Sequence, residues 1–320
     1  LEEMKIRAEQ AELAEERRAL ERLLAEPAAL RGLIQEELAR DADKYGDERR
    51  SPLVAVAASA AALDETEVSP SEPITVILSE KGWVRAAKGH EIDPTTLAYK
   101  AGDGFLAAAR LRSNQQVIFL DSTGRSYSLP ANTLPSARGQ GEPLTGKLSP
   151  PAGASFVAVL GGEGGQRVVL ASDAGYGFVT SLDELQARAK AGKAVLTLPE
   201  GARVLPPRLV LNSGSDRLAV IGSGGHLLVF PIGDLPEMPR GKGNKLMAIP
   251  KARPGEEQER VAHLAVVHQG AGLVITAGKR HLTLPPGAKP GDLDAYQAER
   301  GRRGKLLPRG YQRVEAVKVV

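Results

Sequence analysis

The chain contains no cysteine among its 320 residues, and only 4% of its residues are aromatic. The absence of cysteine excludes disulfides, thiol catalysis and cysteine-bound metal, and it agrees with a reducing compartment. Because aromatic residues are scarce, the core must consist mainly of valine, leucine, isoleucine and alanine. The sequence also lacks an apolar run of about 18 residues, and it begins with a charged segment rather than a signal peptide. A soluble, cytoplasmic protein without a membrane anchor is therefore expected.

Glycine and proline are abundant, with 35 and 22 residues, and the glycines reveal a repeat. Five times an apolar segment reaches a glycine and continues as a second apolar segment, at Gly82, Gly124, Gly175, Gly225 and Gly278. The intervals are 42, 51, 50 and 53 residues. Each repeat has room for four short strands, which is typical of one blade in a propeller-like fold. The sequence predicts a mainly β fold with five blades over residues 73–320, and it leaves open whether they close a ring.

The segment before the repeats has a different pattern. Residues 1–50 are rich in Ala, Leu, Glu and Arg, with Ile6, Leu13 and Leu20 seven residues apart and a break at Pro27. This pattern predicts a helical hairpin or coiled-coil stub, whose exposed apolar stripe implies partner helices. Residues 51–72 are small and acidic and are expected to form a linker; a short helix or strand over residues 53–63 is an alternative.

The net charge of +3 conceals an uneven distribution. Residues 1–50 hold 10 Lys or Arg and 14 Asp or Glu, and residues 51–72 add four acids and no base. The remaining residues, 73–320, therefore carry 32 bases and 21 acids, a net charge of +11. A basic repeat domain behind an acidic leader favours a nucleic-acid partner, although a solvated basic surface with no partner gives the same composition.

Cationic, glycine-rich turns recur at the same place in successive repeats, for example SARGQGEP, ARAKAGK, RGKGNK and ERGRRGK. Glycine lets backbone N–H groups approach phosphate oxygens, while Arg and Lys supply charge and forked donors. Aromatic residues are almost absent from these turns, which favours duplex backbone over stacked single-stranded bases. The candidate DNA-binding residues are Arg85, Lys88, Arg138, Lys147, Arg188, Lys190, Lys193, Arg240, Lys242, Lys245, Arg300, Arg302, Arg303 and Lys305.

No catalytic constellation stands out. The segment from Gly141 to Lys147 matches the first seven positions of a phosphate-binding P-loop, but Leu148 replaces the required Ser or Thr and prolines follow. The five histidines lie in different parts of the repeats, and His263 and His268 would point to opposite faces of a strand. We expect no catalytic residue, metal or cofactor in this chain. A non-catalytic propeller that serves as a scaffold for protein partners is the alternative interpretation.

Several segments resemble one family. SEKGWVRAAKGHEID, DSTGRSYSL, LPSARGQGEPLTGKL, ASDAGYGFV, KGNK and ERGRRGKL are similar to the C-terminal domain of the A subunits of bacterial DNA topoisomerase IV, in the gyrase A-like family. The resemblance covers residues 73–320. The leader, which ends KYGDERRS, resembles the end of the coiled-coil arm of the same subunits.

The resemblance implies a β-pinwheel, in which neighbouring blades exchange strands and a basic outer rim bends duplex DNA. It implies a nucleoid-associated enzyme that contains the B subunit together with a second copy of the A subunit, and that uses ATP and magnesium outside this chain. The catalytic tyrosine also belongs elsewhere, so this chain alone is expected to be inactive. The gyrase relatives carry a box close to QRRGGKG in the first blade, whereas this chain has Lys88-Gly89-His90 there. That difference predicts bending without chiral wrapping.

Overall fold

A computed structural model describes residues 1–47, 71–252, 255 and 257–320. The chain divides into two compact units, Leu1–Ala62 and Leu63–Val320. Much of the expected linker, residues 51–70, lies outside the described residues.

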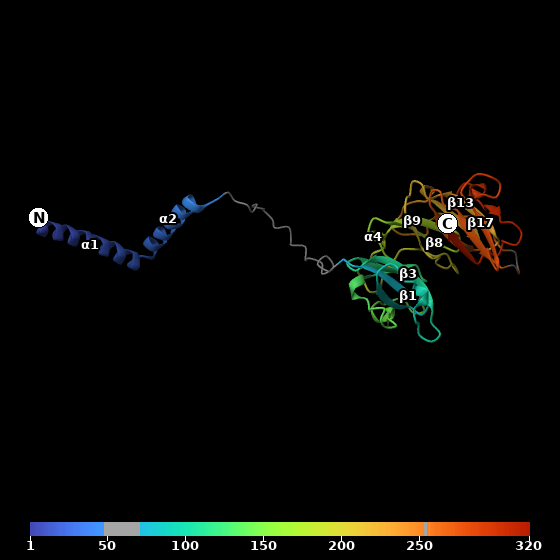
Figure 1. The fold of residues 1–320 in the computed structure, drawn as a ribbon, viewed down its shortest axis with the longest axis horizontal. Coiled ribbons are helices and arrows are strands. Elements are labelled where there is room, and N and C mark those ends of the chain that lie inside the picture. Colours follow the sequence, from blue (N-terminus) through green and yellow to red (C-terminus); the bar gives the residue numbers. More distant parts are fainter. Residues whose placement is uncertain (48–70, 253–254, 256) are drawn as a thin grey trace. The chain divides into compact units, whose positions relative to one another are not determined.

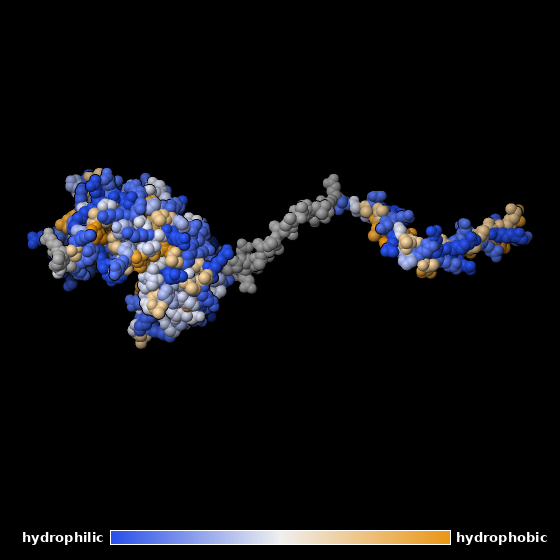
Figure 2. Space-filling view, turned by 180° about the vertical axis from the view of Figure 1, so that it is seen from behind, coloured by the Kyte–Doolittle hydropathy of each residue, from blue (hydrophilic) through white to orange (hydrophobic). Residues whose placement is uncertain are grey.

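Within residues 1–47, the first unit contains two helices, α1 (Glu2–Ala25) and α2 (Pro27–Tyr45) (Figure 1). Pro27 occupies the first position of α2, where its missing N–H costs nothing, and Glu26 is extended between the helices. Neither helix has a buried residue, and Figure 2 shows hydrophilic residues over much of their surface with apolar residues between them. The apolar stripe includes Leu13 and Leu20, which are 58% and 54% exposed. Among the described residues, neither these helices nor any other is long and apolar enough to cross a membrane.

The second unit consists of five antiparallel sheets (Figure 1). The first four sheets have four strands and the fifth has three. The first sheet has the order β3 (Phe105–Arg112), β1 (Pro73–Ser79), β2 (Trp83–Lys88) and β6 (Glu142–Pro143), and the second has β10 (Lys193–Ala194), β5 (Arg125–Pro130), β4 (Gln116–Asp121) and β7 (Phe156–Leu160). The third has β11 (Arg208–Val210), β8 (Arg167–Ser172), β9 (Tyr176–Ser181) and β14 (Asn244–Lys245), and the fourth has β15 (Val261–Val267), β12 (Arg217–Gly222), β13 (His226–Pro231) and β18 (Lys305–Leu306). The fifth sheet has β17 (Arg280–Leu284), β16 (Leu273–Ala277) and β19 (Ala316–Val319).

Short helical turns connect the strands. They are α4 (Leu182–Leu185) and the 3-10 helices η1 (Pro94–Thr96), η2 (Ala131–Thr133), η3 (Leu144–Gly146), η4 (Ile232–Asp234) and η5 (Leu293–Tyr296).

The central strands of the second, third and fourth sheets, β4, β8 and β12, each contribute to two cores. In β4, Val117 and Phe119 pack between the first and second sheets, whereas Ile118 and Leu120 pack between the second and third. This double burial explains why the hairpin strands are continuous apolar runs rather than alternating ones. Two further cores lie between the third and fourth sheets and between the fourth and fifth. Among the described residues, no fifth core joins β16, β17 or β19 to the first sheet, so the sheets do not close a ring.

Neighbouring sheets exchange strands. Each hairpin from the second to the fifth is followed by a two-residue strand that pairs with the hairpin of the preceding sheet. These pairs are β6 with β2, β10 with β5, β14 with β9, and β18 with β13. At the opposite edges, β3 contacts β7, and β15 contacts both β11 and β19. The exchanged strands therefore lie at the outer edges. A mainly β, five-bladed pinwheel preceded by helices is confirmed.

Candidate nucleic-acid interface

Each cationic turn follows the hairpin of one sheet in the chain but lies on the outer edge of the preceding sheet. The segment before the turn runs parallel to the second hairpin strand of that sheet, as Ser136 does beside Ala86 and Glu237 beside Val179. The chain then reverses in the turn and returns as the exchanged strand. As a result, the turns at 137–141, 188–192, 240–243 and 300–304 lie on the first, second, third and fourth sheets. The sequence had assigned each turn to its own repeat, one sheet later.

A glycine with positive φ ends each turn, immediately before the exchanged strand. The φ angles are 88°, 69°, 76° and 81° at Gly141, Gly192, Gly243 and Gly304. A side-chain carbon at Gly243 would overlap the carbonyl oxygen of Gly177 in β9, and one at Gly304 would overlap that of Leu227 in β13. These glycines therefore allow the returning strand to approach the preceding sheet, a structural role distinct from contact with phosphate.

A buried leucine fixes the end of each exchanged segment. The backbone N–H groups of Leu144, Leu196, Leu246 and Leu307 donate to the carbonyls of Gly82, Gly124, Gly175 and Gly225, the glycines of the preceding hairpins, over 3.0, 2.9, 2.7 and 2.9 Å. All four leucines are at most 2% exposed. Each cationic turn is thus held between a parallel segment and a buried anchor, which places it reproducibly on successive sheets.

Six predicted cations have no carboxylate partner among the described residues. Arg138, Arg188, Lys190, Arg240 and Lys245 are exposed, and their side chains make no hydrogen bond or ion pair with another residue that the structure describes. The sixth, Lys242, lies over the ring of Tyr176, with Nζ 3.9 Å from the ring centroid. These side chains retain their charge and donors for an anionic ligand.

Five predicted cations form ion pairs. Lys88 pairs with Glu72 (3.0 Å), Lys147 with Glu142 (3.2 Å), Lys193 with Glu184 (3.9 Å), Arg302 with Glu299 (2.9 Å) and Arg303 with Glu259 (2.9 Å). Exposed pairs of this kind contribute about 0–1 kcal/mol, so a phosphate could displace the carboxylate at small cost. Three of these cations have a second partner, because Nζ of Lys193 donates to the carbonyl of Glu184 over 2.6 Å, Nζ of Lys147 to that of Thr133 over 3.5 Å, and Nε of Arg303 to Nε2 of His226 over 3.1 Å.

The remaining three predicted cations donate to backbone carbonyls, and for Arg85 that carbonyl belongs to a cationic turn. Arg85 is only 4% exposed; it donates to the carbonyl of Gly139 over 3.0 Å and lies over the ring of Tyr99. The expectation that Arg85 faces solvent therefore differs from the structure, because its strand position points into the packed edge. Arg300 donates to the carbonyls of Asp234 and Lys245, and Lys305 to that of Ala295.

Sequence reasoning missed two cations at this edge. Arg125 donates from Nε and an Nη atom to the carbonyls of Ala191 and Gly192, over 3.0 and 2.9 Å. Lys100, in the loop before β3, lies with Nζ 3.3 Å from the ring centroid of Trp83. Both contacts involve the residue that directly follows a hairpin glycine, which is the signal that could have identified them.

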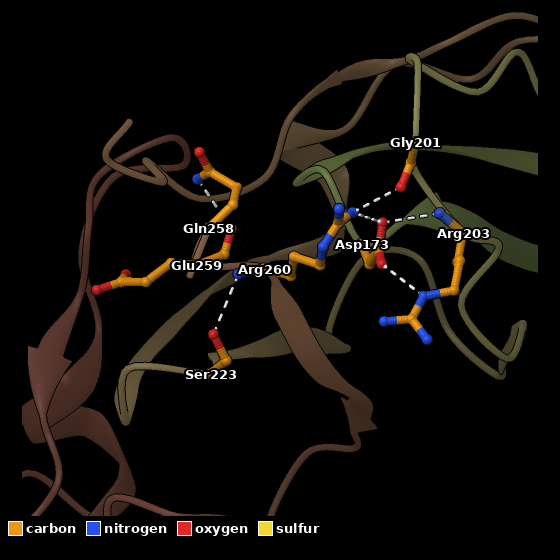
Figure 3. Close-up of polar contacts among 7 residues, drawn as sticks. All are labelled: Asp173, Gly201, Arg203, Ser223, Gln258, Glu259 and Arg260. Atoms are coloured by element: carbon orange, nitrogen blue, oxygen red, sulfur yellow. Dashed lines mark hydrogen bonds and ion pairs between the residues drawn. The ribbon is translucent and has the colours of Figure 1, made fainter. Parts of the chain in front are cut away.

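A buried carboxylate joins the third and fourth sheets near their hairpin ends (Figure 3). Asp173 accepts hydrogen bonds from the backbone N–H and Nε of Arg203, over 2.8 and 3.3 Å, and from Arg260 over 3.2 Å. The same Arg260 donates to the carbonyl of Gly201, and its backbone N–H donates to Ser223. Asp173 is only 4% exposed, so this cluster connects the two sheets through a buried carboxylate.

The inner side of the sheets has a different character. A hollow of about 800 Å³ is lined mainly by apolar residues of β3 and β7, together with Pro206 and Pro207. One of its two cations, Arg208, donates to the carbonyl of Leu264, and burial lowers the pKa of this guanidinium. The unpaired cations of the turns therefore lie at the outer edges, away from this hollow.

Other kinds of site find little support in the described part of the chain. No group of three or more His, Asp or Glu side chains there is arranged to hold a metal. The segment that resembles a P-loop contains η3, a single 3-10 turn of three residues, and residues 148–155, which follow it, form no helix. The histidines are likewise separate: His226 contacts Arg303, His263 contacts the carbonyl of Val314, and His90 contacts that of Leu111.

The fold and the outer-edge turns define the class of protein. Five sheets joined by exchanged strands form a β-pinwheel, and the family model of the DNA gyrase C-terminal domain, a β-propeller, matches residues 166–210 and 216–268. The solved C-terminal domain of a DNA gyrase A has the same fold, with a TM-score of 0.56 at 14% identity, covering 78% of this chain and 83% of that one.

Closer relatives identify the family. The A subunit of DNA topoisomerase 4 from Pseudomonas aeruginosa is 57% identical over 319 residues, and that from Escherichia coli K12 is 50% identical over the same length. The solved structure of the E. coli ParC C-terminal domain is 50% identical, with a TM-score of 0.69, and covers 78% of this chain and 99% of that domain. The chain belongs to the family of DNA topoisomerase IV A subunits. It spans 42% of the length of the two curated relatives, and the match covers 100% of this chain.

Proposed function

We propose that the outer edge of the pinwheel binds and bends duplex DNA without sequence specificity. The observation that carries this proposal is the placement of the four cationic turns on four successive sheets, with six cations free of carboxylates among the described residues. Backbone phosphates recur along any duplex, so contacts of this kind select no sequence.

The proposed role is substrate selection within topoisomerase IV. The chain would present a DNA segment to an enzyme that contains the B subunit together with a second copy of the A subunit. That enzyme would decatenate and relax DNA with ATP in the bacterial cytoplasm, at the nucleoid. Bending a site of 20–30 bp costs about 1–6 kcal/mol, and phosphate contacts spread over four sheets would offset that cost. Arg85 is left out of the proposed contacts because it is buried.

A protein-interaction scaffold is less consistent with the surface. Such a function requires a contiguous exposed apolar patch. In the described part of the second unit, the large exposed apolar residues are Leu106, Leu211, Leu306 and Val320, which belong to different sheets or connections.

The salt dependence of DNA binding tests the proposal. If the six unpaired cations each neutralise one phosphate, the slope of log K against log[salt] should be about −5, since each contact contributes about −0.9. Affinity should then fall by about 10³ between 50 and 200 mM salt. Engagement of the paired and backbone-bound cations as well would steepen the slope.

The measurement is a titration of fluorescent 30-bp duplexes of two unrelated sequences, with donor and acceptor dyes at the duplex ends to report bending. A variant with Arg138, Arg188, Lys190 and Arg240 changed to alanine should lose about four units of slope. A matched variant with four helix arginines changed to alanine, Arg7, Arg17, Arg31 and Arg40, should retain it. A flat slope for the unmodified chain, or a strong preference for one sequence, would exclude the proposed function.

A further inference from the structure

The residue that follows each hairpin glycine occupies an equivalent position in the first four sheets. Trp83, Arg125, Tyr176 and His226 each begin the second hairpin strand. Each also pairs in register with the second residue of the exchanged strand, which is Pro143, Ala194, Lys245 or Leu306. We call these four residues the platform residues. They share a position, but two of them, Trp83 and Tyr176, present an aromatic face to a lysine, whereas Arg125 and His226 make polar contacts.

Every platform residue contacts either a cation or the backbone at its own outer edge. In the third sheet Lys242 of the turn lies over Tyr176 at 3.9 Å, and in the first sheet Lys100 lies over Trp83 at 3.3 Å. In the second sheet Arg125 donates to two carbonyls of the turn. In the fourth sheet Arg303 of the turn donates to His226.

Aromatic platforms order a cation without neutralising it. A lysine side chain has four flexible bonds, and restricting them before binding lowers the entropic cost of meeting a phosphate. An aromatic face attracts the ammonium through its quadrupole but carries no net charge, so the full positive charge remains available to the phosphate. A carboxylate partner orders a cation too, yet it must be displaced, as at the pair of Arg303 with Glu259.

We propose that Trp83 and Tyr176 are positioning residues of the DNA interface, and that Lys100 is a phosphate contact of the first sheet. This inference rests on the proposed function and assigns a role to residues that do not themselves carry the charge. The first and third sheets then hold ordered, unneutralised lysines. The fourth sheet contributes less, because Arg303 is engaged by both His226 and Glu259.

A double-mutant cycle at Tyr176 and Lys242 tests the positioning role. Tyr176→Leu should weaken duplex binding about two- to fivefold, which is the affinity equivalent of an exposed cation–π contact. Tyr176→Phe keeps the aromatic face and should bind like the unmodified chain. Lys242→Ala should weaken binding and reduce the salt slope by about one. In the Lys242→Ala background, Tyr176→Leu should have no further effect, because the two residues act through one contact.

The outcomes separate the two proposals. If the unmodified chain shows no salt-dependent DNA binding, the proposed function fails and the platform role fails with it. If the chain binds but Tyr176→Leu weakens binding equally with and without Lys242, or Tyr176→Phe fails to restore it, the positioning role alone is overturned. Circular dichroism and the unfolding midpoint of each variant establish that a loss of affinity does not reflect loss of fold.

Lys100 has a matched control in Lys289, an exposed lysine in the loop before η5 with no side-chain partner among the described residues. Lys100→Ala should reduce the slope of log K against log[salt] by about one, whereas Lys289→Ala should leave it unchanged. Trp83 is the only tryptophan of the chain, so its emission should also change when DNA binds beside Lys100. Equal slopes for Lys100→Ala and the unmodified chain would remove Lys100 from the interface.

Discussion

Replacing Gly243 with alanine tests whether strand exchange depends on the glycine before each exchanged strand. Gly243 has φ of +76°, a conformation that costs a residue with a side chain about 1–2 kcal/mol. Its new methyl group would also overlap the carbonyl oxygen of Gly177, so β14 must move away from β9. Leu246, fully buried directly after β14, would lose part of its packing, which for a whole leucine side chain contributes about 1.5–3 kcal/mol. With about half of the leucine packing lost, the expected loss in the free energy of unfolding is about 2–4 kcal/mol, as the sum of these two effects.

Gly270 provides the matched control, because its φ is +79° and its surroundings are open. Gly270→Ala should therefore cost only the backbone term of about 1–2 kcal/mol. Urea unfolding followed by far-UV circular dichroism measures both changes. The reasoning would be refuted if the two alanine variants lost the same stability, since steric overlap with Gly177 would then contribute nothing.

Two further predictions concern buried or partly buried polar groups. Burial, together with the charge of Arg303, lowers the pKa of His226 below its ordinary value of 6.5. The imidazole is therefore protonated more readily in the unfolded chain than in the folded chain. The contribution of His226 to stability should be complete above pH 6.5 and decline as the pH falls below it. Urea unfolding between about pH 7.5 and 5.5 should show a smaller decline for His226→Gln, and equal declines would contradict this assignment. Asp173→Ala should cost about 2 kcal/mol, because it removes a buried acceptor shared by two arginines, whereas Arg203→Ala should cost less than about 1 kcal/mol, since that side chain is 81% exposed. Thermal unfolding of both variants measures the difference, and a larger loss for Arg203→Ala would contradict it.

The sequence was sufficient for the repeat and for the kind of residue in each turn. Glycines at regular intervals indicate local backbone geometry, and continuous apolar runs indicate strands buried on both faces. A short segment of sequence encodes both properties by itself. The helices were equally local: Pro27 separates α1 from α2, as its fixed φ and missing N–H require. The family resemblance predicted strand exchange, and the pairing of β6, β10, β14 and β18 confirms it.

The placement of individual cations could not be obtained in this way. Arg85 and Lys88 look alike in the sequence, yet Arg85 is buried against the turn and Lys88 is exposed. The difference arises because alternate residues of a strand face opposite ways, and only the pairing of the neighbouring turn decides which face is covered. Lys100 was missed for a related reason, since its contact with Trp83 joins a loop to a strand.

What the sequence alone determined was therefore the inventory: five repeats, basic turns rich in glycine, and an acidic leader with helical periodicity. Tertiary structure decided which sheet each turn belongs to and which cations remain free. Exchange moves every turn onto the preceding sheet, where backbone pairing and a buried leucine position it. That pairing joins residues far apart in the chain, such as Gly177 of β9 and Asn244 of β14, and the energies that select it come from packing between sheets rather than from local preference.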